Sequence, residues 1–173
     1  MADPVTPNDN AATAQNIEGD GRQVLLQKFF VKDASLEVPD APAVFTKAWK
    51  PDIDVQVNTR VMPLAQDQWQ VVLIITVTAK LGDETAFLVE AHQAGIFLLK
   101  GFNNDTERGA VLGAYCPALI FPFARETVAD LVQRAGFPQL LLQPINFDQL
   151  YLMHQRQKAA AAGNASDAAP VTH

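Results

Sequence analysis

The side chains of this chain that are best able to do chemistry are one cysteine and three histidines. Cys116 lies in the stretch LGAYCPALIFPFARE, and the histidines are His92, His154 and His173. A cysteine nucleophile needs a lowered pKa, which a neighbouring histidine, a lysine or a helix N-terminus supplies. Nothing in the spacing of the histidines indicates that they converge on Cys116. We therefore interpret Cys116 as a small buried apolar residue, and an enzyme that uses this thiol stays open as an alternative.

Carboxylate pairs are the other candidates for chemistry. Asp83 and Glu84 follow a glycine in a predicted turn, where solvated charge is the usual role. Asp33 and Glu37 lie two alternation steps apart in a predicted strand and so point to one face. Together with Glu90 they form an acidic patch if the first and fourth strands present the same face. The motifs CxxC, HExxH, GxGxxG, Walker A and GxSxG do not occur, so the sequence predicts no catalytic residue, metal or cofactor.

Composition narrows the class of protein. The chain has 173 residues, 49% of them hydrophobic and 18% charged, with a net charge of −6. This length predicts one domain with a real core, and the acidic balance argues against nucleic-acid binding. The low share of charge leaves apolar surface for oligomerisation or apolar partners. A single cysteine, no secretory signal and no run of ~18 apolar residues predict a cytoplasmic protein that does not insert into membranes.

Periodicity predicts the elements that would position these residues. Four segments read as strands, with alternating or β-branched apolar residues: residues 29–38, 53–59, 69–80 and 86–99. Their short and medium connections favour an antiparallel sheet. Helical periodicity follows over residues 106–134, where two prolines should break or kink the helix, and Asn146 is a good N-cap for a last helix. The result is an α+β fold in one domain, residues 23–158, with disordered tails at 1–22 and 159–173.

The segment between the first two predicted strands is unusual. Residues 39–52 contain three prolines, which forbid a continuous strand or a long helix. They also carry Phe45 and Trp49, for which a solvated loop has little use. Such a segment covers a core or forms the wall of a groove, and we prefer the core-covering role on general grounds.

Four long stretches of the sequence resemble the SecB family of protein-export chaperones. They are KDASLEVPDAPAVFTKAWKP, VTAKLGDETAFLVEAHQAGIF, LGAYCPALIFPFARE and GFPQLLLQPINFDQLY. The resemblance covers residues 29–155 in collinear order. It implies a four-stranded antiparallel sheet followed by helices, assembled as a homotetramer that is a dimer of dimers. It also implies an ATP-independent cytoplasmic holdase, which binds non-native precursor proteins and delivers them to the SecA translocation ATPase.

The resemblance also implies two binding surfaces. The SecA-binding surface, called the acidic face below, consists of Asp33, Glu37, Leu88 and Glu90. The groove for unfolded client proteins consists of Phe45, Trp49, Phe137, Leu140, Leu142, Phe147 and Leu150. In the family the segment around Cys116 is a structural bend. A chaperone of the same fold that serves another client system, such as a toxin–antitoxin pair, is the alternative function that the sequence leaves open.

Overall fold

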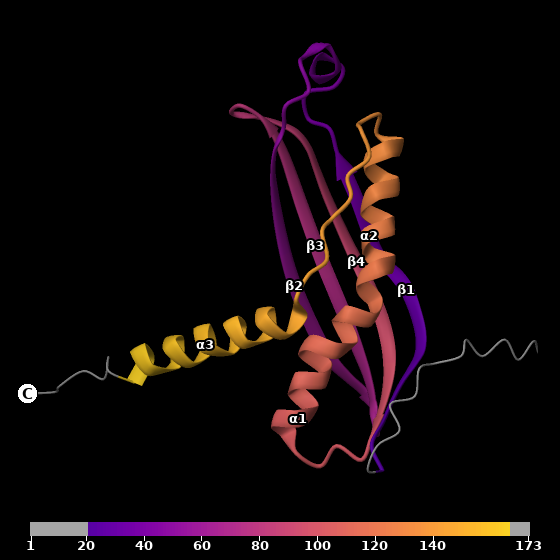
Figure 1. Ribbon diagram of the computed structural model, residues 1–173, viewed down its shortest axis with the longest axis vertical. Coiled ribbons are helices and arrows are strands. Elements are labelled where there is room, and N and C mark those ends of the chain that lie inside the picture. Colours follow the sequence, from indigo (N-terminus) through magenta and orange to yellow (C-terminus); the bar gives the residue numbers. More distant parts are fainter. Residues whose placement is uncertain (1–20, 167–173) are drawn as a thin grey trace, which may run out of the picture.

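Four long strands form the sheet of the protein, which we describe from a computed structural model (Figure 1). The structure describes residues 21–166. The strands are β1 (Gln23–Glu37), β2 (Asp52–Ala65), β3 (Gln68–Leu81) and β4 (Glu84–Lys100). All neighbouring pairs are antiparallel, in the spatial order β1-β4-β3-β2. The predicted four-stranded antiparallel sheet is confirmed. Most of the two predicted tails, residues 1–20 and 167–173, lies outside the described residues.

The link between β1 and β2 crosses the end of the sheet, because these consecutive strands form its two opposite edges. Residues 38–51, here called the crossover segment, make this crossing and include one 3-10 turn, η1 (Ala43–Thr46). Pro39, Pro42 and Pro51 remove backbone donors along it. The chain therefore cannot add a further strand here and instead forms a separate loop above the sheet.

A continuous helical stretch follows the sheet. It consists of α1 (Asp105–Ala110), the π-helical turn η2 (Val111–Tyr115) and α2 (Cys116–Arg134), close to the predicted 106–134. Pro117 is the second residue of α2, directly after the π turn, and it cannot donate a backbone hydrogen bond to the preceding turn. The wider π turn lets the N–H of Cys116 reach the carbonyl of Val111. Pro122 lies inside α2 without ending it, so neither proline breaks the helix.

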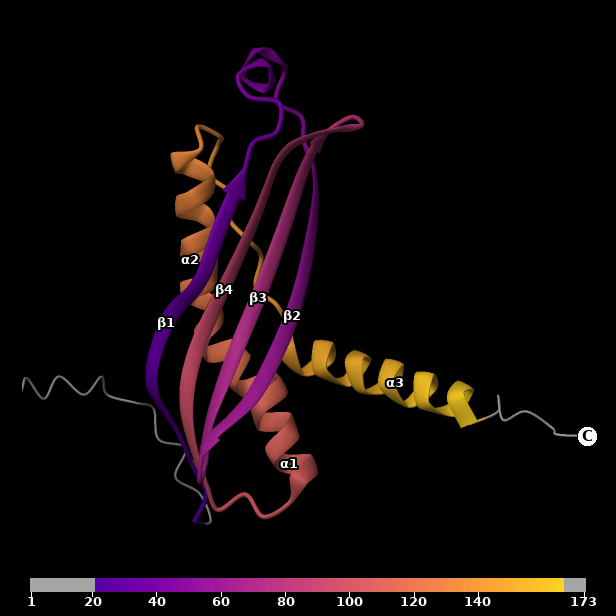
Figure 2. The ribbon, with the colours of Figure 1, turned by 180° about the vertical axis from the view of Figure 1, so that it is seen from behind.

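The last helix, α3 (Phe147–Ser166), begins where the sequence predicts. The side-chain oxygen of Asn146 accepts a hydrogen bond of 3.0 Å from the backbone N–H of Gln149, which caps the helix. The helix continues past residue 158, where the sequence analysis placed the start of an alanine-rich tail. Alanine is the best helix former, so the alanine run prolongs α3. Both ribbon views show α3 pointing away from the sheet (Figures 1 and 2).

The core lies between α2 and one face of the sheet (Figure 1). The β4 residues predicted to share a face are all buried there: Phe87, Val89, Ala91, Phe97 and Leu99. They pack in one cluster with Ile120, Val128 and Val132 of α2. The opposite side of the sheet, seen in Figure 2 and called the open face below, carries only a small apolar cluster. One face of the sheet is thus committed to folding, and the other is available for contacts.

Close contact between two helices holds α3 in place and gives a stability prediction. A Cβ built on Gly113 would lie 2.4 Å from Cδ2 of Tyr151. We expect Gly113→Ala to lower the free energy of unfolding by about 1–3 kcal/mol, since the ring edge cannot yield freely. Urea unfolding measures this change. In a Tyr151→Ala background the same substitution should be neutral or stabilising, because alanine is the better helix former. Equal destabilisation in both backgrounds would contradict the contact.

Candidate functional site

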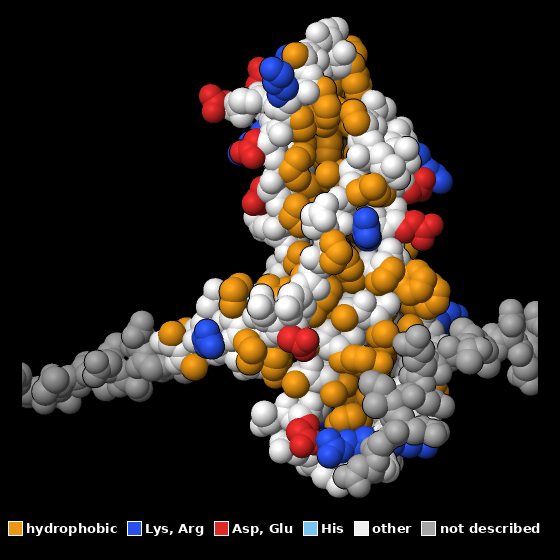
Figure 3. All heavy atoms as spheres, in the orientation of Figure 1, with side chains coloured by type: hydrophobic (Ala, Val, Ile, Leu, Met, Phe, Trp, Pro, Cys, Tyr) orange, Lys and Arg blue, Asp and Glu red, His pale blue; other side chains and the backbone are white. Residues whose placement is uncertain are grey.

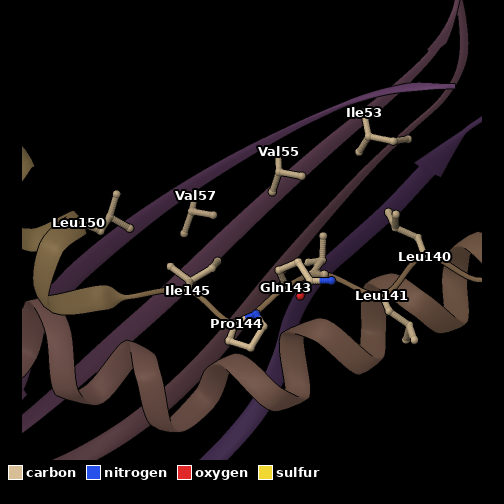
Figure 4. Close-up of a pocket in the computed structure, with 10 residues that line it drawn as sticks. Ile53, Val55, Val57, Leu140, Leu141, Gln143, Pro144, Ile145 and Leu150 are labelled. Carbon is tan, nitrogen blue, oxygen red and sulfur yellow. The ribbon is translucent and has the colours of Figure 1, made fainter.

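An apolar groove lies on the helix side of the sheet. On the face shown in Figure 3, hydrophobic side chains gather in a hollow over the upper half of the sheet. The hollow contains a cavity of about 490 Å³ between β2 and the segment that connects α2 to α3. Figure 4 shows how its walls are built. They consist of Ile53, Val55 and Val57 from β2, residues 140–145 from the connecting segment, and Leu150 from α3.

The groove exists because β2 is an edge strand with one apolar side. Residues 53, 55 and 57 point to the same side of the sheet as the buried face of β3, with which they pair in register. Proline-fenced residues 140–145 run alongside this strand instead of covering it. Val55 remains 41% exposed and Leu141 53% exposed. Apolar side chains that are held apart in this way can bind another apolar segment.

The groove residues predicted from the sequence fall into three environments: the cavity, the base of α3 and an aromatic cluster under the crossover segment. Leu140, Leu142 and Leu150 line the cavity, and their contact with clients stays a prediction. Phe147 is buried and meets Phe121 edge to face, with ring centroids 5.6 Å apart. Phe147 therefore supports the base of α3, and its part in binding stays a prediction.

The predicted aromatic residues form a cluster under the crossover segment. The ring of Phe137 lies 5.1 Å from Phe45, 5.1 Å from Trp49 and 5.0 Å from Phe87, measured between centroids. Phe137 is only 6% exposed, whereas Phe45 is 50% exposed. Trp49 is partly buried against the core. The crossover segment therefore covers the core through Trp49 and presents Phe45 to solvent.

An ion-pair cluster ties the crossover segment to the sheet. The ammonium group of Lys47 lies 2.6 Å from a carboxylate oxygen of Asp40 and also contacts the carboxylate of Glu84, the first residue of β4. These hydrogen bonds raise the pKa of Lys47 above its ordinary value. These contacts connect the crossover segment, which also carries Phe45 and Trp49, to the start of β4.

The strand side of the groove was not identified from the sequence. The alternation of Ile53, Val55 and Val57 predicts one apolar face of a strand, but not whether a helix covers it. The edge position of β2 would identify this wall, but that position follows from strand order. Strand order depends on long-range pairing, which local periodicity does not encode.

The four residues of the acidic face come together on the open face. In the β1–β4 register, Glu37 lies opposite Leu88 and Ser35 opposite Glu90, with Asp33 one alternation step further along β1. Asp33 and Glu37 are exposed, whereas Leu88 and Glu90 are half-buried. The sequence condition for this patch, that the first and fourth strands present one face, is therefore met. Whether this patch binds SecA stays a prediction.

Glu90 is the most tightly held carboxylate of this face. Its Oε1 lies 2.7 Å from Nε2 of His92, and its Oε2 accepts a hydrogen bond of 2.9 Å from the hydroxyl of Thr76. The hydrogen bond from His92, followed by that from Thr76, holds the pKa of Glu90 below its ordinary value, and the nearby charge of Arg60 adds to the effect. Glu90 is therefore ionised at neutral pH and presents a fixed negative charge.

Cys116 is fully buried in the core cluster. Burial raises the pKa of its thiol well above the ordinary range, so the nucleophilic thiolate does not form at physiological pH. The interpretation of Cys116 as a small apolar core residue is confirmed. In the part of the chain that the structure describes, no three His, Cys, Asp or Glu side chains gather closely enough to hold a metal ion.

Within residues 21–166, no helix combines the length and the hydropathy needed to cross a bilayer.

Comparisons with known proteins agree with this architecture. The SecB family profile, described as preprotein translocase subunit SecB, matches residues 18–158. The protein-export protein SecB of Nitrosococcus oceani is 51% identical over 146 residues, covering 83% of this chain and 88% of the relative. SecB of Psychrobacter arcticus is 52% identical over 143 residues, covering 83% and 95%. SecB of Halorhodospira halophila is 48% identical over 164 residues, covering 94% and 92%.

A solved structure shares the fold. It is the Mycobacterium tuberculosis SecB-like chaperone Rv1957 in complex with a peptide from the antitoxin HigA1. The TM-score is 0.60 over 70% of this chain and 90% of that chain, at 16% sequence identity. At this identity the likeness concerns the fold alone. The family profile and the half-identical relatives extend over the sheet, the crossover segment and the helices described above. The chain belongs to the SecB family of protein-export chaperones.

Proposed function

We propose that this protein holds non-native precursor proteins in the groove and transfers them to SecA at the acidic face. The observation that carries the proposal is the arrangement of the two surfaces. The apolar groove lies on the helix side of the sheet, and the charged patch lies on the open face. Because the surfaces are on opposite sides of one sheet, a client and a docking partner can bind at the same time.

The chemistry of the groove suits a binder of many sequences. Its lining is apolar apart from Gln143, so it offers little that would select one sequence over another. Burying one large apolar side chain of a client contributes ~1.5–3 kcal/mol, and several subsites add up through multivalency. An extended client chain meets the proline-fenced segment 140–145 along the groove. ATP has no role in this scheme, and release follows when the docked partner competes with the groove for the client itself.

A homotetramer, as a dimer of dimers in the cytoplasm, completes the proposal. β1 is an edge strand that carries Phe29 and Val31, which are 42% and 49% exposed. Phe29 stacks on Phe123 of α2 with centroids 3.9 Å apart, so the exposed apolar surface is continuous between strand and helix. An unpaired strand edge with apolar neighbours favours pairing with another chain. Four chains would also multiply the number of grooves available to one client.

A role with a toxin–antitoxin pair is the second candidate. It draws support from the fold shared with Rv1957, whose structure contains an antitoxin peptide. The likeness is limited to 16% identity, whereas the export proteins are about half identical. We therefore prefer protein export, and failure to bind SecA together with capture of an antitoxin would reverse this preference.

Light scattering tests the holding function. The pure protein is expected to have four times the 18.8 kDa mass of one chain. After addition of an unfolded, slow-folding precursor without nucleotide, the mass should rise to that of a soluble complex. A monomer that leaves the precursor to aggregate would refute both the assembly and the holding function.

A further inference from the structure

Two exposed cations lie on the open face at positions that the strand register fixes. Lys28 of β1 lies opposite Ile96, which follows Glu90 by six residues on β4, so all three side chains point to the open face. Arg60 of β2 lies opposite Val72 of β3, which belongs to the small apolar cluster of this face. Both cations are exposed. The open face therefore carries positive charge as well as the acidic face.

A third cation reaches this area from a bulge in β1. The register between β1 and β4 shifts between Val31 and Asp33, and Lys32 is the extra residue. Its ammonium group donates a hydrogen bond of 3.3 Å to the side-chain oxygen of Gln70 on β3. Because β4 lies between β1 and β3, the side chain extends across β4 toward the middle of the sheet. Lys28, Lys32 and Arg60 are called the basic patch below.

The basic patch has no anion of its own. In the part of the chain that the structure describes, none of its three members forms an ion pair, whereas Lys47, Arg108 and Arg134 each pair with a carboxylate. An unpaired cation on a free surface is hydrated. When a partner covers it, that water is lost, and the cost is high unless the partner supplies a negative charge.

The acidic face and the basic patch follow one another along the strands. Glu90 and the β4 residue opposite Lys28 are six residues apart, which corresponds to about 20 Å along an antiparallel strand. Arg60 lies nearer, since its positive charge helps to lower the pKa of Glu90. The small apolar cluster of the open face lies in between. The charge along the sheet therefore changes from negative to positive across this cluster.

We infer that the SecA element that docks at the acidic face is dipolar and places a carboxylate against the basic patch. This inference rests on the docking function proposed above. An element that is basic throughout would be attracted by Glu90 but repelled by Lys32 and Arg60, and like charges brought together in an interface are costly. A dipolar element satisfies both ends in only one of its two orientations along the strands. The basic patch therefore sets the orientation of the docked partner.

The test measures the affinity of the full-length protein for purified SecA after the charge of the patch is reversed. Lys28→Glu combined with Lys32→Glu makes the open face more acidic. A partner that is basic throughout would then bind more tightly, whereas a dipolar partner should bind about tenfold more weakly. Arg156→Glu combined with Lys158→Glu makes the same change of charge at exposed positions of α3. This control should bind SecA as tightly as the unmodified protein or slightly more tightly.

Arg60→Glu repeats the test from the opposite edge strand, in case the β1 variant does not fold or assemble. It should bind SecA about threefold to fivefold more weakly. Unchanged or tighter binding by either folded variant would overturn the inference. Glu90→Gln separates this failure from that of the proposed function. If Glu90→Gln binds SecA as tightly as the unmodified protein, the acidic face is not the docking site. If it binds weakly while the patch variants bind normally, only the dipolar partner is wrong.

Discussion

Reversing the charge of Glu90 is expected to abolish SecA docking and to leave client binding intact. Glu90→Lys replaces a clamped carboxylate with an ammonium group near the positive charge of Arg60, so the centre of the acidic face becomes basic. Like charges brought together in an interface cost several kcal/mol, which corresponds to a loss of affinity on the order of 100-fold. Surface plasmon resonance with immobilised SecA measures this loss.

The control for Glu90→Lys must change the charge by the same amount elsewhere. Asp83→Lys does so in the exposed β3–β4 turn, and we expect it to lower the affinity for SecA only slightly. Both variants should protect an unfolded precursor from aggregation as well as the unmodified protein does, because the groove lies on the other side of the sheet. Loss of client protection by Glu90→Lys, or equal loss of docking by both variants, would contradict the separation of the two surfaces.

Placing charge in the groove is expected to weaken client binding and to leave SecA docking intact. Val55→Asp combined with Leu141→Asp introduces two carboxylates among the residues that line the cavity, one on β2 and one on the connecting segment. Each replaces apolar contacts with a client side chain that contribute ~1.5–3 kcal/mol. We expect at least tenfold weaker binding of an unfolded precursor, by the usual conversion of free energy to affinity. Both residues are about half exposed, so the fold should tolerate the change.

The strand itself offers the matched control for the groove. Gln56 is the next residue after Val55 on β2 and points to the open face. Gln56→Asp therefore introduces the same charge on the opposite side of the same strand. Fluorescence anisotropy with a labelled precursor should show weak binding for the groove variant and near-normal binding for the Gln56 variant. Equal affinities for the two would show that clients bind elsewhere.

Much of the sheet could be predicted from the sequence because its signals are local. Alternation along β1 and β4 predicts which side chains share a face, and the N-cap at Asn146 predicts the start of α3. The alanine run lacks an apolar stripe, which predicts a tail, yet its helix propensity prolongs α3 to Ser166. Pro122 was expected to break or kink a helix that in fact continues through it.

The candidate sites also contain a part that could be predicted from the sequence and a part that could not. The acidic face could be assembled from the resemblance, and the pairing of β1 with β4 then brings its members together. The β2 wall of the groove could not be predicted, because it depends on β2 being an uncovered edge. The aromatic residues were assigned to the groove by position, whereas Phe137 and Phe147 are buried by contacts with distant residues. His92 carried no signal until its distance to Glu90 was known.

Site-specific crosslinking tests the central claim, that unfolded clients bind in the groove between β2 and residues 140–145. The only native cysteine, Cys116, is buried with a raised pKa and does not compete for labelling. A photoreactive label on Val55→Cys is compared with the same label on Gln56→Cys, in the presence of an unfolded precursor. We predict strong crosslinking from position 55 and little from position 56. Equal crosslinking from both positions, or a stronger product from position 56, would contradict the account.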